Sequence, residues 1–573
     1  MLNKLKNFFK ILETNERYKI FILFLMMVLA VILEVASIAS ILPLSREFFE
    51  PGENLFFLKN FNFLNSYQGI YILIIFFLII YFFKFIYLFY FYYFQNTIIN
   101  NLSANLTTRL FNTYLYKNYE FHTQNNSSVM VRNLVTEIKL LCSSFVNPIF
   151  VLIIEATIIS GILIFLFNYE VMISIYMGLI FITLIAIYSL VLKKYFLKWG
   201  NQRQTLNNLS LKFSLQGLNG IKEIMIYSKE NFFKNIFSNN EYEYAALSKN
   251  HQTFQQLPRL LFEFIIILLL ISLMFFLKYQ DLPNSKIFEI LGVFSLAAIR
   301  FIPSASKIIG SLQMLRFATP AMNVILDEDI LSKEKINEIL KKQNNNEDYK
   351  FLKSIAIKNM SFKFENKDEF IFKNINLELK KNEIIGIYGP SGSGKSTFVD
   401  LICGLLKPTS GIMTMDEQSV ESNFFSWRKK FGYVTQSTYL IDDTIKNNIL
   451  FGETENFDAS RFQEAIKLSQ LYNFVEHLPN GIETIVGERG AMLSGGQIQR
   501  IGIARAVYHK SEILIFDEST NSLDVDSEQK IIDAIVSLKD KKTIIMISHK
   551  MSVLKICNKI YKIKDKKLEL KNE

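Results

Sequence analysis

A glycine-rich stretch, GPSGSGKST, follows an apolar run that ends at Tyr388 and precedes a helical pattern. It fits the spacing GxxxxGK[ST], in which glycines let the backbone curl until its N–H groups converge on phosphate oxygens at a helix N-terminus. We expect a bound nucleotide, with Lys395 directed toward its β- and γ-phosphates and Ser396 toward Mg²⁺. The predicted loop consists of Gly389, Pro390, Ser391, Gly392, Ser393, Gly394, Lys395, Ser396 and Thr397.

Further along the chain, the apolar run EILIFDES (512–519) ends in two acids, Asp517 and Glu518. Asp517 is a candidate ligand of Mg²⁺, directly or through water. Glu518 is the candidate general base, because a carboxylate beside the γ-phosphate orients and polarises an attacking water. Two acids at a strand end are also typical of an ordinary surface turn. The phosphate loop already requires a Mg²⁺ partner, which favours the catalytic interpretation.

Two further side chains complete the candidate catalytic set. His549 ends a third apolar run, KTIIMISHK, at the carboxyl end of a strand, where ligands collect in an α/β sheet. It is therefore a candidate γ-phosphate contact, although a lone histidine is more often structural. Gln436 follows another short apolar run and is able to reach Mg²⁺ or the water. The predicted catalytic residues are Glu518, His549, Gln436 and Lys395, and the predicted metal ligands are Ser396, Gln436 and Asp517.

A second candidate anion site lies in GERGAMLSGGQIQR (487–500). There Ser494, Gly495 and Gly496 offer a hydroxyl and unobstructed backbone N–H groups, which suit an anion. Yet the chain already carries a better phosphate loop about a hundred residues earlier. The residues alone leave open whose phosphate this second segment would bind.

The elements that must position these groups change character near residue 320. Residues 19–317 contain long uninterrupted apolar runs, whereas 320–573 alternate as a soluble domain does, beginning with antiparallel-strand patterns in 351–379. A chain of 573 residues is also too long for one core. The sequence predicts an α-helical six-span transmembrane domain (1–320), a linker (321–350) and an α/β P-loop nucleotide-binding domain (351–573).

Apolar runs long enough to cross about 30 Å of hydrocarbon begin near residues 19, 68, 145, 171, 258 and 287. If the N-terminus is inside, the inner segments carry nineteen Lys and Arg and the outer segments four, which predicts that both termini are cytoplasmic. These membrane-flanking cations account for the net charge of +10, so no nucleic-acid partner is expected. The three cysteines are far apart, which indicates neither a disulfide framework nor a metal site.

Two inner segments, 96–141 and 193–259, are long, polar and helix-compatible, with little Pro or Gly. We expect the membrane helices to continue into the cytosol and turn back near 119–128 and 216–223. The two turns would form elbows able to press on the soluble domain. Simple loops are the alternative, but loops of this length without structure are uncommon.

Charges within membrane spans are costly and therefore informative. Lys84 and Arg300 lie at similar depths, roughly 20–24 Å from the outer ends of their spans at 1.5 Å per residue. Lys307 shares a helix face with Arg300, and Ser304 lies between them. A cationic stripe of this kind along a central cavity would suit a phosphate-bearing substrate. The alternatives are snorkelling to the inner headgroups or pairing with one of the buried acids Glu34, Glu155 and Glu263.

In order and rough spacing, the soluble motifs resemble those of ATP-binding cassette (ABC) proteins. They are GPSGSGKST, Gln436, LSGGQ (493–497), ILIFDE (513–518), SLD (522–524) and His549. With six preceding spans on one chain, the protein resembles a half-transporter of the ABC exporter type. The resemblance is highly specific over about 350–570 and rests on layout, with weak sequence similarity, in the membrane half. VTQ, STNSLD and SHK depart from the commoner PQ, ATSALD and AHR, and none of these departures removes a catalytic group.

This resemblance implies an answer for the second anion site. In such proteins the signature residues close over ATP held by a second cassette, so Ser494, Gly495 and Gly496 would contact the partner's γ-phosphate, with Gln497 in support. By the same likeness Asp524 would bridge the interface. Phe364 would stack on adenine, and VGERG (486–490) would contact the elbows. Because Glu518 and the signature are both intact, the resemblance favours a homodimer with two working sites.

Two membrane segments, EVASIASILPL (34–44) and AAIRFIPSASKIIGSL (297–312), resemble flippases of lipid-linked oligosaccharides. Such lipids carry a diphosphate, which agrees with the cationic stripe. The resemblance and the stripe rely in part on the same residues of segment 297–312. The resemblance implies ATP-driven movement of an amphipathic, anionic lipid substrate across the cytoplasmic (inner) membrane, with membrane lipids around it. A multidrug or general lipid exporter is the main alternative. An ATP-gated channel or a sensor that transports nothing is a second one.

Overall fold

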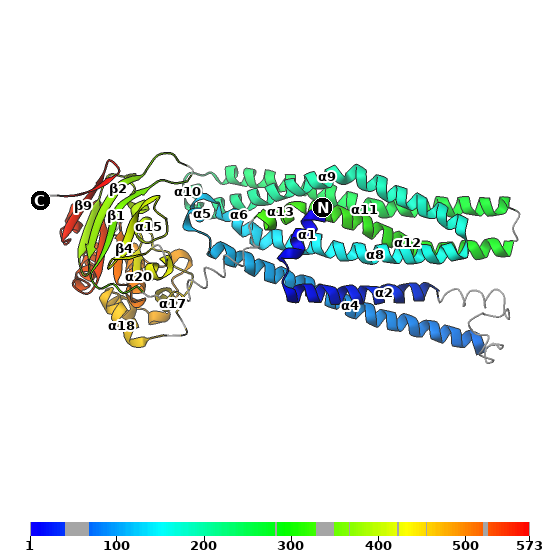
Figure 1. The fold of residues 1–573 in the computed structure, drawn as a ribbon, viewed down its shortest axis with the longest axis horizontal. Helices are drawn as coiled ribbons and strands as arrows, with labels where there is room; N and C mark the ends of the chain where they lie inside the picture. The colour runs from blue at the N-terminus through cyan, green and yellow to red at the C-terminus, as the bar shows by residue number, and fades with distance from the viewer. Residues whose placement is uncertain are drawn as a thin grey trace. The chain divides into compact units, whose positions relative to one another are not determined.

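The computed structural model describes residues 2–39, 68–280, 284–327, 349–365, 367–420, 423–453, 455, 457–519 and 525–571. The chain forms two compact units (Figure 1). The membrane unit comprises Met1–Lys117 and Asn125–Glu334, and the cassette unit comprises Asn118–Gln124 and Lys335–Glu573. Of the expected linker 321–350, residues 321–327 are helical and 328–348 lie outside the described residues.

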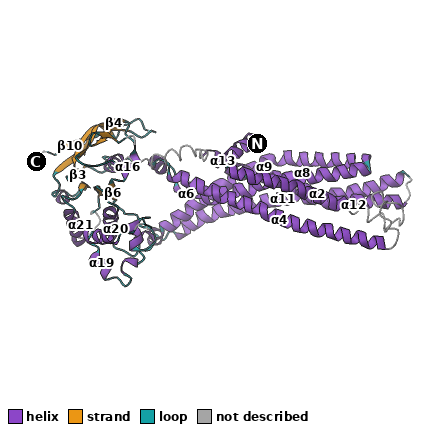
Figure 2. Cartoon of the chain, turned by 60° about the horizontal axis from the view of Figure 1, so that its bottom comes forward, coloured by secondary structure: helices purple, strands orange, loops and turns teal. Residues whose placement is uncertain are grey.

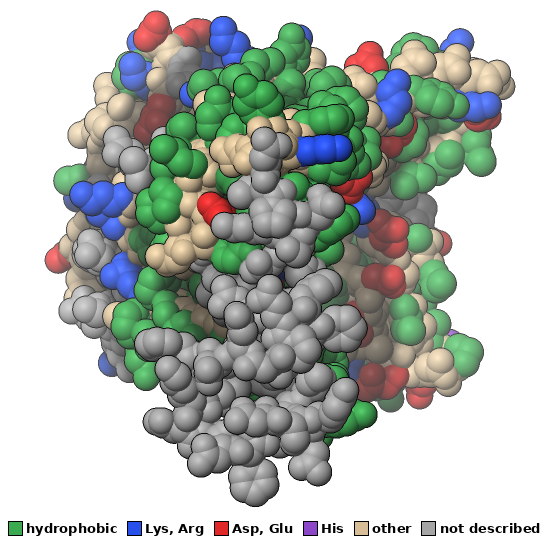
Figure 3. All heavy atoms as spheres, turned by 90° about the vertical axis from the view of Figure 1, so that its right-hand side faces the viewer, with side chains coloured by type: hydrophobic (Ala, Val, Ile, Leu, Met, Phe, Trp, Pro, Cys, Tyr) green, Lys and Arg blue, Asp and Glu red, His purple; other side chains and the backbone are tan. Residues whose placement is uncertain are grey.

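The described part of the membrane unit is helical. Its elements are α1 (Leu2–Ile11), α2 (Thr14–Ala39), α4 (Gln68–Leu115), α6 (Ser127–Arg132), the π-helical turns η1 (Asn133–Glu137) and η2 (Cys142–Val146), α7 (Ile138–Leu141), α8 (Asn147–Tyr169), α9 (Val171–Asn219), α10 (Ile221–Ile226), α11 (Glu230–Tyr279), α12 (Asn284–Phe317) and α13 (Thr319–Asp327). In Figure 3 apolar side chains gather over the upper part of the face turned toward the viewer.

Among the described residues, five helical stretches are long and apolar enough to cross a membrane, judged by length and composition. They are Ile74–Leu115, Ser127–Tyr169, Val171–Asn219, Glu230–Tyr279 and Ile290–Phe317. The remaining expected span, from residue 19, falls on α2, a helix of 26 residues.

Three of the helices are far longer than a bilayer requires. Helices α4, α9 and α11 contain 48, 49 and 50 residues. At 1.5 Å per residue each extends about 72–75 Å, roughly twice the hydrocarbon thickness. Their polar halves end at two short helices, α5 (Tyr119–Gln124) and α10 (Ile221–Ile226), at the turns where elbows are expected. The first of these, α5, belongs to the cassette unit.

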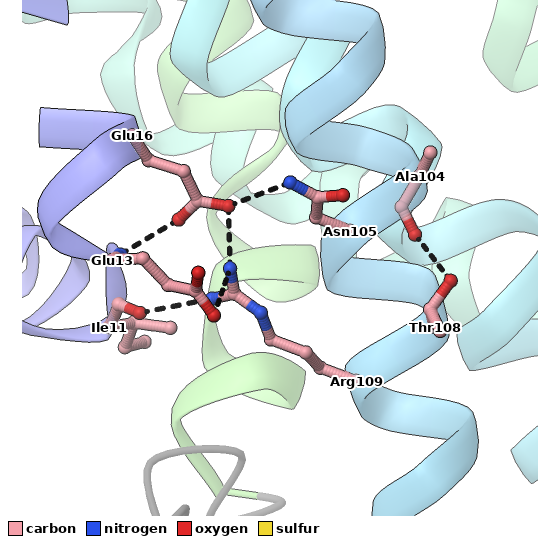
Figure 4. A network of polar contacts seen from close by, with 7 residues as sticks. All are labelled: Ile11, Glu13, Glu16, Ala104, Asn105, Thr108 and Arg109. Atoms are coloured by element: carbon pink, nitrogen blue, oxygen red, sulfur yellow. Dashed lines mark hydrogen bonds and ion pairs between the residues drawn. The ribbon is translucent and has the colours of Figure 1, made fainter. Parts of the chain in front are cut away.

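A polar network fixes the turn between α1 and α2 against α4 (Figure 4). The Arg109 guanidinium on α4 lies 2.6 Å from the Glu16 carboxylate and 3.0 Å from that of Glu13. It also donates to the carbonyl oxygen of Ile11 at 3.3 Å, and Asn105 donates to Glu16 at 3.1 Å. One arginine thereby pairs with two acids and holds the N-terminal turn on α4.

The helices of the membrane unit form a bundle. Within it α12 packs against α8, α9 and α11, while α2 packs against α4 and α8. The end of α12 approaches α9 closely at Gly200. A Cβ atom at that position would lie 2.3 Å from the carbonyl oxygen of Phe317. Any larger residue there would therefore push the end of α12 away.

The cassette unit contains two sheets with helices around them (Figure 2). Its strands are β1 (Ser354–Phe362), β2 (Phe372–Lys380), β3 (Ile384–Tyr388), β4 (Ser410–Met415), β5 (Gln418–Ser419), β6 (Phe431–Val434), β7 (Ile513–Asp517), β8 (Thr543–Ile547), β9 (Lys559–Lys564) and β10 (Lys567–Leu570). Its further helices are α15 (Lys395–Ile402), α16 (Phe424–Arg428), α17 (Ile445–Leu450), α18 (Ala459–Leu468), α19 (Tyr472–Glu476), α20 (Gly495–Tyr508), α21 (Val525–Ser537), α22 (Met551–Leu554) and the 3₁₀ turns η3 (Gly481–Glu483) and η4 (Glu488–Gly490).

The first sheet is antiparallel, in the order β2-β1-β4-β5, and the second has the order β10-β9-β3-β8-β7-β6. In the second sheet β3, β8, β7 and β6 are parallel. Successive residues of its buried strands face opposite cores, as the two-residue period requires. Ile513 and Ile515 pack with α15 and the antiparallel sheet, whereas Leu514 and Phe516 pack with α20 and α21. Burial on both faces explains why these strands read as unbroken apolar runs.

Candidate nucleotide-binding site

The phosphate loop lies between β3 and α15, as the sequence predicts. Gly392 and Gly394 have φ angles of +79° and +95°, a region that residues with side chains rarely adopt. Gly394 precedes the first residue of α15, and a Cβ atom there would lie 2.8 Å from the Phe372 ring. Glycine is therefore required at 394, and its conformation directs the loop onto the N-terminus of α15.

Lys395 and Ser393 are the polar side chains enclosed by this loop. The Lys395 ammonium donates to the carbonyl oxygens of Gly389 and Pro390, both at 3.2 Å, and lies 3.7 Å from a Glu518 carboxylate oxygen. The Ser393 hydroxyl is buried without a hydrogen-bond partner among the described residues. An unsatisfied hydroxyl beside a cation and converging N–H groups fits a phosphate chain. Ser396 is exposed in the first turn of α15.

Strand order explains how Glu518 and His549 meet. Strands β7 and β8 are parallel neighbours, and β8 also pairs with β3, so the carboxyl ends of all three strands lie at one edge of the sheet. There the His549 Nε2 atom lies 2.8 Å from Glu518 Oε1. The backbone of Glu518 has φ +49°, which is uncommon for a residue with a side chain. The structure thus brings three of the predicted catalytic residues, Lys395, Glu518 and His549, into one cluster.

Asp517 is buried beside this cluster. It accepts a hydrogen bond from the Tyr433 hydroxyl at 2.9 Å, and Tyr433 lies on the neighbouring strand β6. Burial raises the pKa of Asp517 above its usual value, and the nearby Glu518 charge raises it further. A buried carboxylate of this kind would be stabilised by a bound cation. Tyr433 is not among the residues predicted from the sequence, although it stands three residues before Gln436 in the same apolar run.

A second acid, Asp400 on α15, faces the same region. Burial raises the pKa of Asp400 to about 6, and the neighbouring Asp517 contributes in the same direction. The folded protein therefore binds this proton more tightly than the unfolded chain does. Between about pH 4 and 6 the folded state carries more protons, so the free energy of unfolding falls as the pH rises through this window.

Replacing Asp400 with asparagine is expected to remove that penalty. The Asp400→Asn protein should melt at a higher temperature than the unmodified protein at pH 8, and the difference should shrink toward pH 4. Thermal unfolding of the full-length protein at several pH values measures this effect. The exposed residue Asp368 supplies the matched control, because Asp368→Asn should leave the melting temperature nearly unchanged at every pH. A pH-independent gain in the Asp400 variant would contradict the proposed cause.

Gln436 is exposed just after β6, and its backbone is tied to helix α20. The buried Gln499 amide donates to the carbonyl oxygen of Gln436 at 2.6 Å and to that of Thr435 at 3.0 Å. Gln499 lies only two residues after the LSGGQ segment. It connects the signature helix with the Gln436 loop, and its position in LSGGQIQR is the only sequence signal that could have suggested this role.

The signature segment forms the N-terminus of α20. The Ser494 hydroxyl accepts from the Gln497 N–H at 3.3 Å, and the Gln497 side chain accepts from the Ser494 N–H at 2.8 Å. Ser494 and Gly495 are exposed, whereas Gly496 is buried. Helix α20 packs against the edge strand β6, three strand positions from β3. At about 4.8 Å per strand this separation is roughly 14 Å, so the signature is not adjacent to its own phosphate loop.

The structure says less about the roles of the remaining predicted residues of the cassette. Phe364 is half-buried, with its ring 5.0 Å from that of Phe362 in an edge-to-face arrangement. Asp524 lies outside the described residues. No group of three or more His, Cys, Asp or Glu in the described ranges could hold a metal ion by itself. A Mg²⁺ ion here would therefore need phosphate oxygens in addition to protein ligands, as nucleotide-bound Mg²⁺ has.

In the membrane unit the cations of the expected stripe are paired with carboxylates. Glu34 on α2 lies 2.5 Å from the Lys84 ammonium and also pairs with the Arg300 guanidinium. Lys307 lies 2.7 Å from Glu155. The stripe is thus not a row of unpaired charges; the pairing alternative is the arrangement found. The physical reason is that a charge removed from water needs a nearby countercharge.

Ser304 and Glu263 also depart from a simple stripe. Ser304 is completely buried, and its hydroxyl has no hydrogen-bond partner in the described part of the chain. Glu263 pairs with Arg259, one helical turn away at 2.8 Å, and not with a stripe cation. The cluster of Glu34, Lys84 and Arg300 nevertheless combines two cations with one anion, which gives it a formal charge of +1.

A phosphate loop on a parallel sheet, facing two strand-end carboxylates and joined to membrane-length helices, defines a membrane-bound P-loop ATPase. Comparison with known families makes this more specific. Residues 372–521 match the family model described as ABC transporter, and residues 20–299 match the ABC transporter transmembrane region. The chain belongs to the ABC transporters. It is an exporter-type half-transporter, with one membrane domain and one ATP-binding domain, whose ATPase activity is coupled to transport.

Individual relatives agree with this assignment. The chain is 26% identical over 464 residues to the ATP-dependent lipid A-core flippases of Escherichia coli (strain K12) and Shigella sonnei (strain Ss046), covering 80% of this chain and 78% of each relative. Among solved structures, a bacterial Atm1-family ABC exporter with ATP bound superimposes with a TM-score of 0.77 at 18% identity. That comparison covers 96% of this chain and 94% of the other, which shows a shared fold over both domains.

Proposed function

We propose that two copies of this chain form a homodimer with two composite ATP sites, and that it moves a lipid-linked oligosaccharide or related glycolipid across the cytoplasmic membrane. The observation that carries the dimer is the position of the signature. Ser494 and Gly495 are exposed at the N-terminus of a helix that packs on β6, far from the phosphate loop after β3. A helix N-terminus attracts phosphate. Its phosphate then comes from ATP on a second subunit.

Within each composite site, the chain's own residues divide the work. Lys395 exchanges its carbonyl contacts for the β- and γ-phosphates, and Phe364 stacks on the adenine. Ser396, Gln436 and Asp517 would hold Mg²⁺, and the charge of the ion would offset that of the phosphates. Glu518 accepts the proton of the attacking water, and His549, already 2.8 Å from Glu518, orients that carboxylate and contacts the γ-phosphate.

The free energy for transport comes from the different affinities of ATP for the closed and open pairs of cassettes. Closure of the pair moves the elbows α5 and α10, which continue into the long helices, and thereby shifts the spans between two arrangements. The polar halves of α4, α9 and α11 are then cytosolic, in line with the excess of cations in the segments they form.

The substrate proposal rests on charge. The Glu34, Lys84 and Arg300 cluster keeps a formal charge of +1 at membrane depth, and the Arg300 side chain is 28% exposed. An excess cation within a span is costly unless a ligand uses it. An amphipathic anion, such as a lipid diphosphate, would complete the pairing. A general multidrug exporter is the second candidate. It ranks lower because it would not need this charge.

Replacing Arg300 with alanine is expected to reduce transport of a fluorescent polyprenyl-diphosphate saccharide in vesicles by at least about tenfold, since one charged contact contributes on the order of 1.5–3 kcal/mol. Basal ATP hydrolysis should be largely retained. Lys84→Ala should behave similarly.

The Glu34→Gln variant provides the decisive comparison. It leaves both cations in place and removes their carboxylate partner, so it should bind the diphosphate lipid at least as tightly as the unmodified protein. If Glu34→Gln is as impaired as Arg300→Ala, the cluster only supports the fold. Full transport by both Arg300→Ala and Lys84→Ala would also contradict the anionic-substrate proposal.

A further inference from the structure

The membrane unit contains a cavity of about 580 Å³ between α8, α11 and α12. It lies where the apolar runs of these helices begin or end. Asn147 is the first residue of α8, and Gln255–Glu263 precede the apolar run 264–277 of α11. The cavity is therefore at the junction between the membrane-spanning part and the polar extensions, which is the depth of lipid headgroups.

Amide and hydroxyl groups dominate the polar lining of this cavity. The side chains of Gln255 and Gln256 make no hydrogen bond with other described residues, and both line the space. Asn147 uses its oxygen to accept from Gln95 at 2.8 Å, which leaves its N–H groups for another partner. The Ser306 hydroxyl is shielded from solvent and also lacks a partner among the described residues. Each free amide can both donate and accept hydrogen bonds.

The charged groups of the cavity compensate one another. Arg259 pairs with Glu263 at 2.8 Å, and Lys307 pairs with Glu155 at 2.7 Å. Glu155 does not itself line the cavity, but its pairing with Lys307 brings the formal charge of these four groups to zero, unlike the +1 cluster around Glu34. A cavity with no net charge and several two-way hydrogen-bonding groups suits an uncharged, polyhydroxylated ligand better than it suits a bare phosphate.

We propose that this cavity binds the uncharged glycosyl headgroup of the transported lipid in the leaflet next to the polar extensions. The inference rests on the proposed function for the link to transport. Lys307 follows Arg300 by seven residues on α12, and Ser311 follows it by eleven, which corresponds to about 10 and 16 Å along the helix. A diphosphate at the Glu34 cluster would thus have room for its first sugars in the cavity, so that one site selects charge and the other selects sugar.

Binding of a phosphate-free probe tests the cavity separately. The probe is a fluorescent monoglucosyl diacylglycerol, titrated onto full-length protein in nanodiscs. The double variant Gln255→Leu/Gln256→Leu should bind it about thirtyfold more weakly, because one hydrogen bond of about 1 kcal/mol is lost at each glutamine. The matched control is Gln252→Leu, an exposed glutamine one turn earlier on α11 that does not line the cavity, and it should bind as the unmodified protein does.

A second probe, polyprenyl diphosphate without sugar, separates this inference from the substrate proposal. The double glutamine variant should bind that lipid normally, whereas Arg300→Ala should bind it poorly. Absence of glucolipid binding by the unmodified protein, or equal binding by the double variant, overturns the glycosyl site. If the double variant binds both lipids more weakly and to the same extent, the glycosyl site is also overturned, since the substitutions then act on the fold. If the unmodified protein binds the glucolipid but not the diphosphate lipid, the proposed role of the charge cluster is overturned and the glycosyl site remains supported.

Discussion

Replacing Glu518 with glutamine should lower steady-state ATP hydrolysis about 10²- to 10⁴-fold, the range that a positioned general base contributes. The amide keeps the size of the carboxylate but cannot accept the water's proton. Because the Lys395 and loop contacts remain, ATP should still bind with nearly unchanged affinity. Lipid transport in vesicles should stop together with hydrolysis. Single-turnover hydrolysis and equilibrium nucleotide binding, measured on the same preparation, check both parts of this expectation.

A matched acid at the opposite end of β7 provides the control. Glu512 immediately precedes β7, about 17 Å from its carboxyl end at 3.3–3.4 Å per residue, and pairs with Lys430 at 2.8 Å. Glu512→Gln should retain hydrolysis, since its carboxylate is remote from the phosphate loop. Hydrolysis at the normal rate by Glu518→Gln would show that another group is the base. Continued leakage of small ions through the Glu518→Gln protein with ATP bound would instead favour an ATP-gated channel.

The second large effect concerns which subunit supplies the signature. Lys395→Ala removes the phosphate-binding cation, and Ser494→Arg blocks the signature with a bulky side chain, so either homodimer should be inactive. A mixed dimer with one substitution on each subunit should recover about half of the normal ATPase rate, because one of its two composite sites contains both intact parts. Two affinity tags allow the mixed dimer to be purified, and its ATPase rate is then compared with both parents.

The same two substitutions placed on one subunit give the opposite expectation. Paired with an unmodified subunit, the Lys395→Ala/Ser494→Arg chain damages both composite sites, so this mixed dimer should be inactive. If each subunit instead used its own signature, the unmodified subunit would remain active here and the first mixed dimer would be dead. The two dimers contain the same number of substitutions, so a general loss of stability cannot produce this reversal.

Several features of the site were predictable because they depend on short-range rules. The glycines at 392 and 394 adopt the left-handed conformations that the loop pattern requires. The runs that end in Asp517 and His549 are buried parallel strands, and burial on both faces makes such strands recognisable as unbroken apolar segments. The long helices were equally accessible, since apolar runs longer than a bilayer requires, followed by helix-compatible polar segments, indicate continuous helices.

Other features could not be read from the chain because they depend on partners distant in sequence. Tyr433 reaches Asp517 only because β6 lies beside β7, a strand more than 75 residues later. Gln499 ties the Gln436 loop to α20 through backbone carbonyls, and backbone acceptors have no sequence signature. The pairing of Lys84 and Arg300 with Glu34 likewise joins three helices. Sequence reasoning gave the depth of these charges but left open whether carboxylates or ligands neutralise them.

By itself the sequence determined the division into a membrane half and a P-loop half, the nucleotide chemistry and the family, because local spacing and hydrophobic runs encode all of these. Only the tertiary structure decided that Lys84 and Arg300 share the Glu34 carboxylate, that the signature lies on the β6 side of the cassette, and that uncharged amides line a cavity beside α12. These features arise where segments far apart in the chain meet. There the cost of burying charge and unsatisfied polar groups selects the partners, and that cost is set by the packed fold.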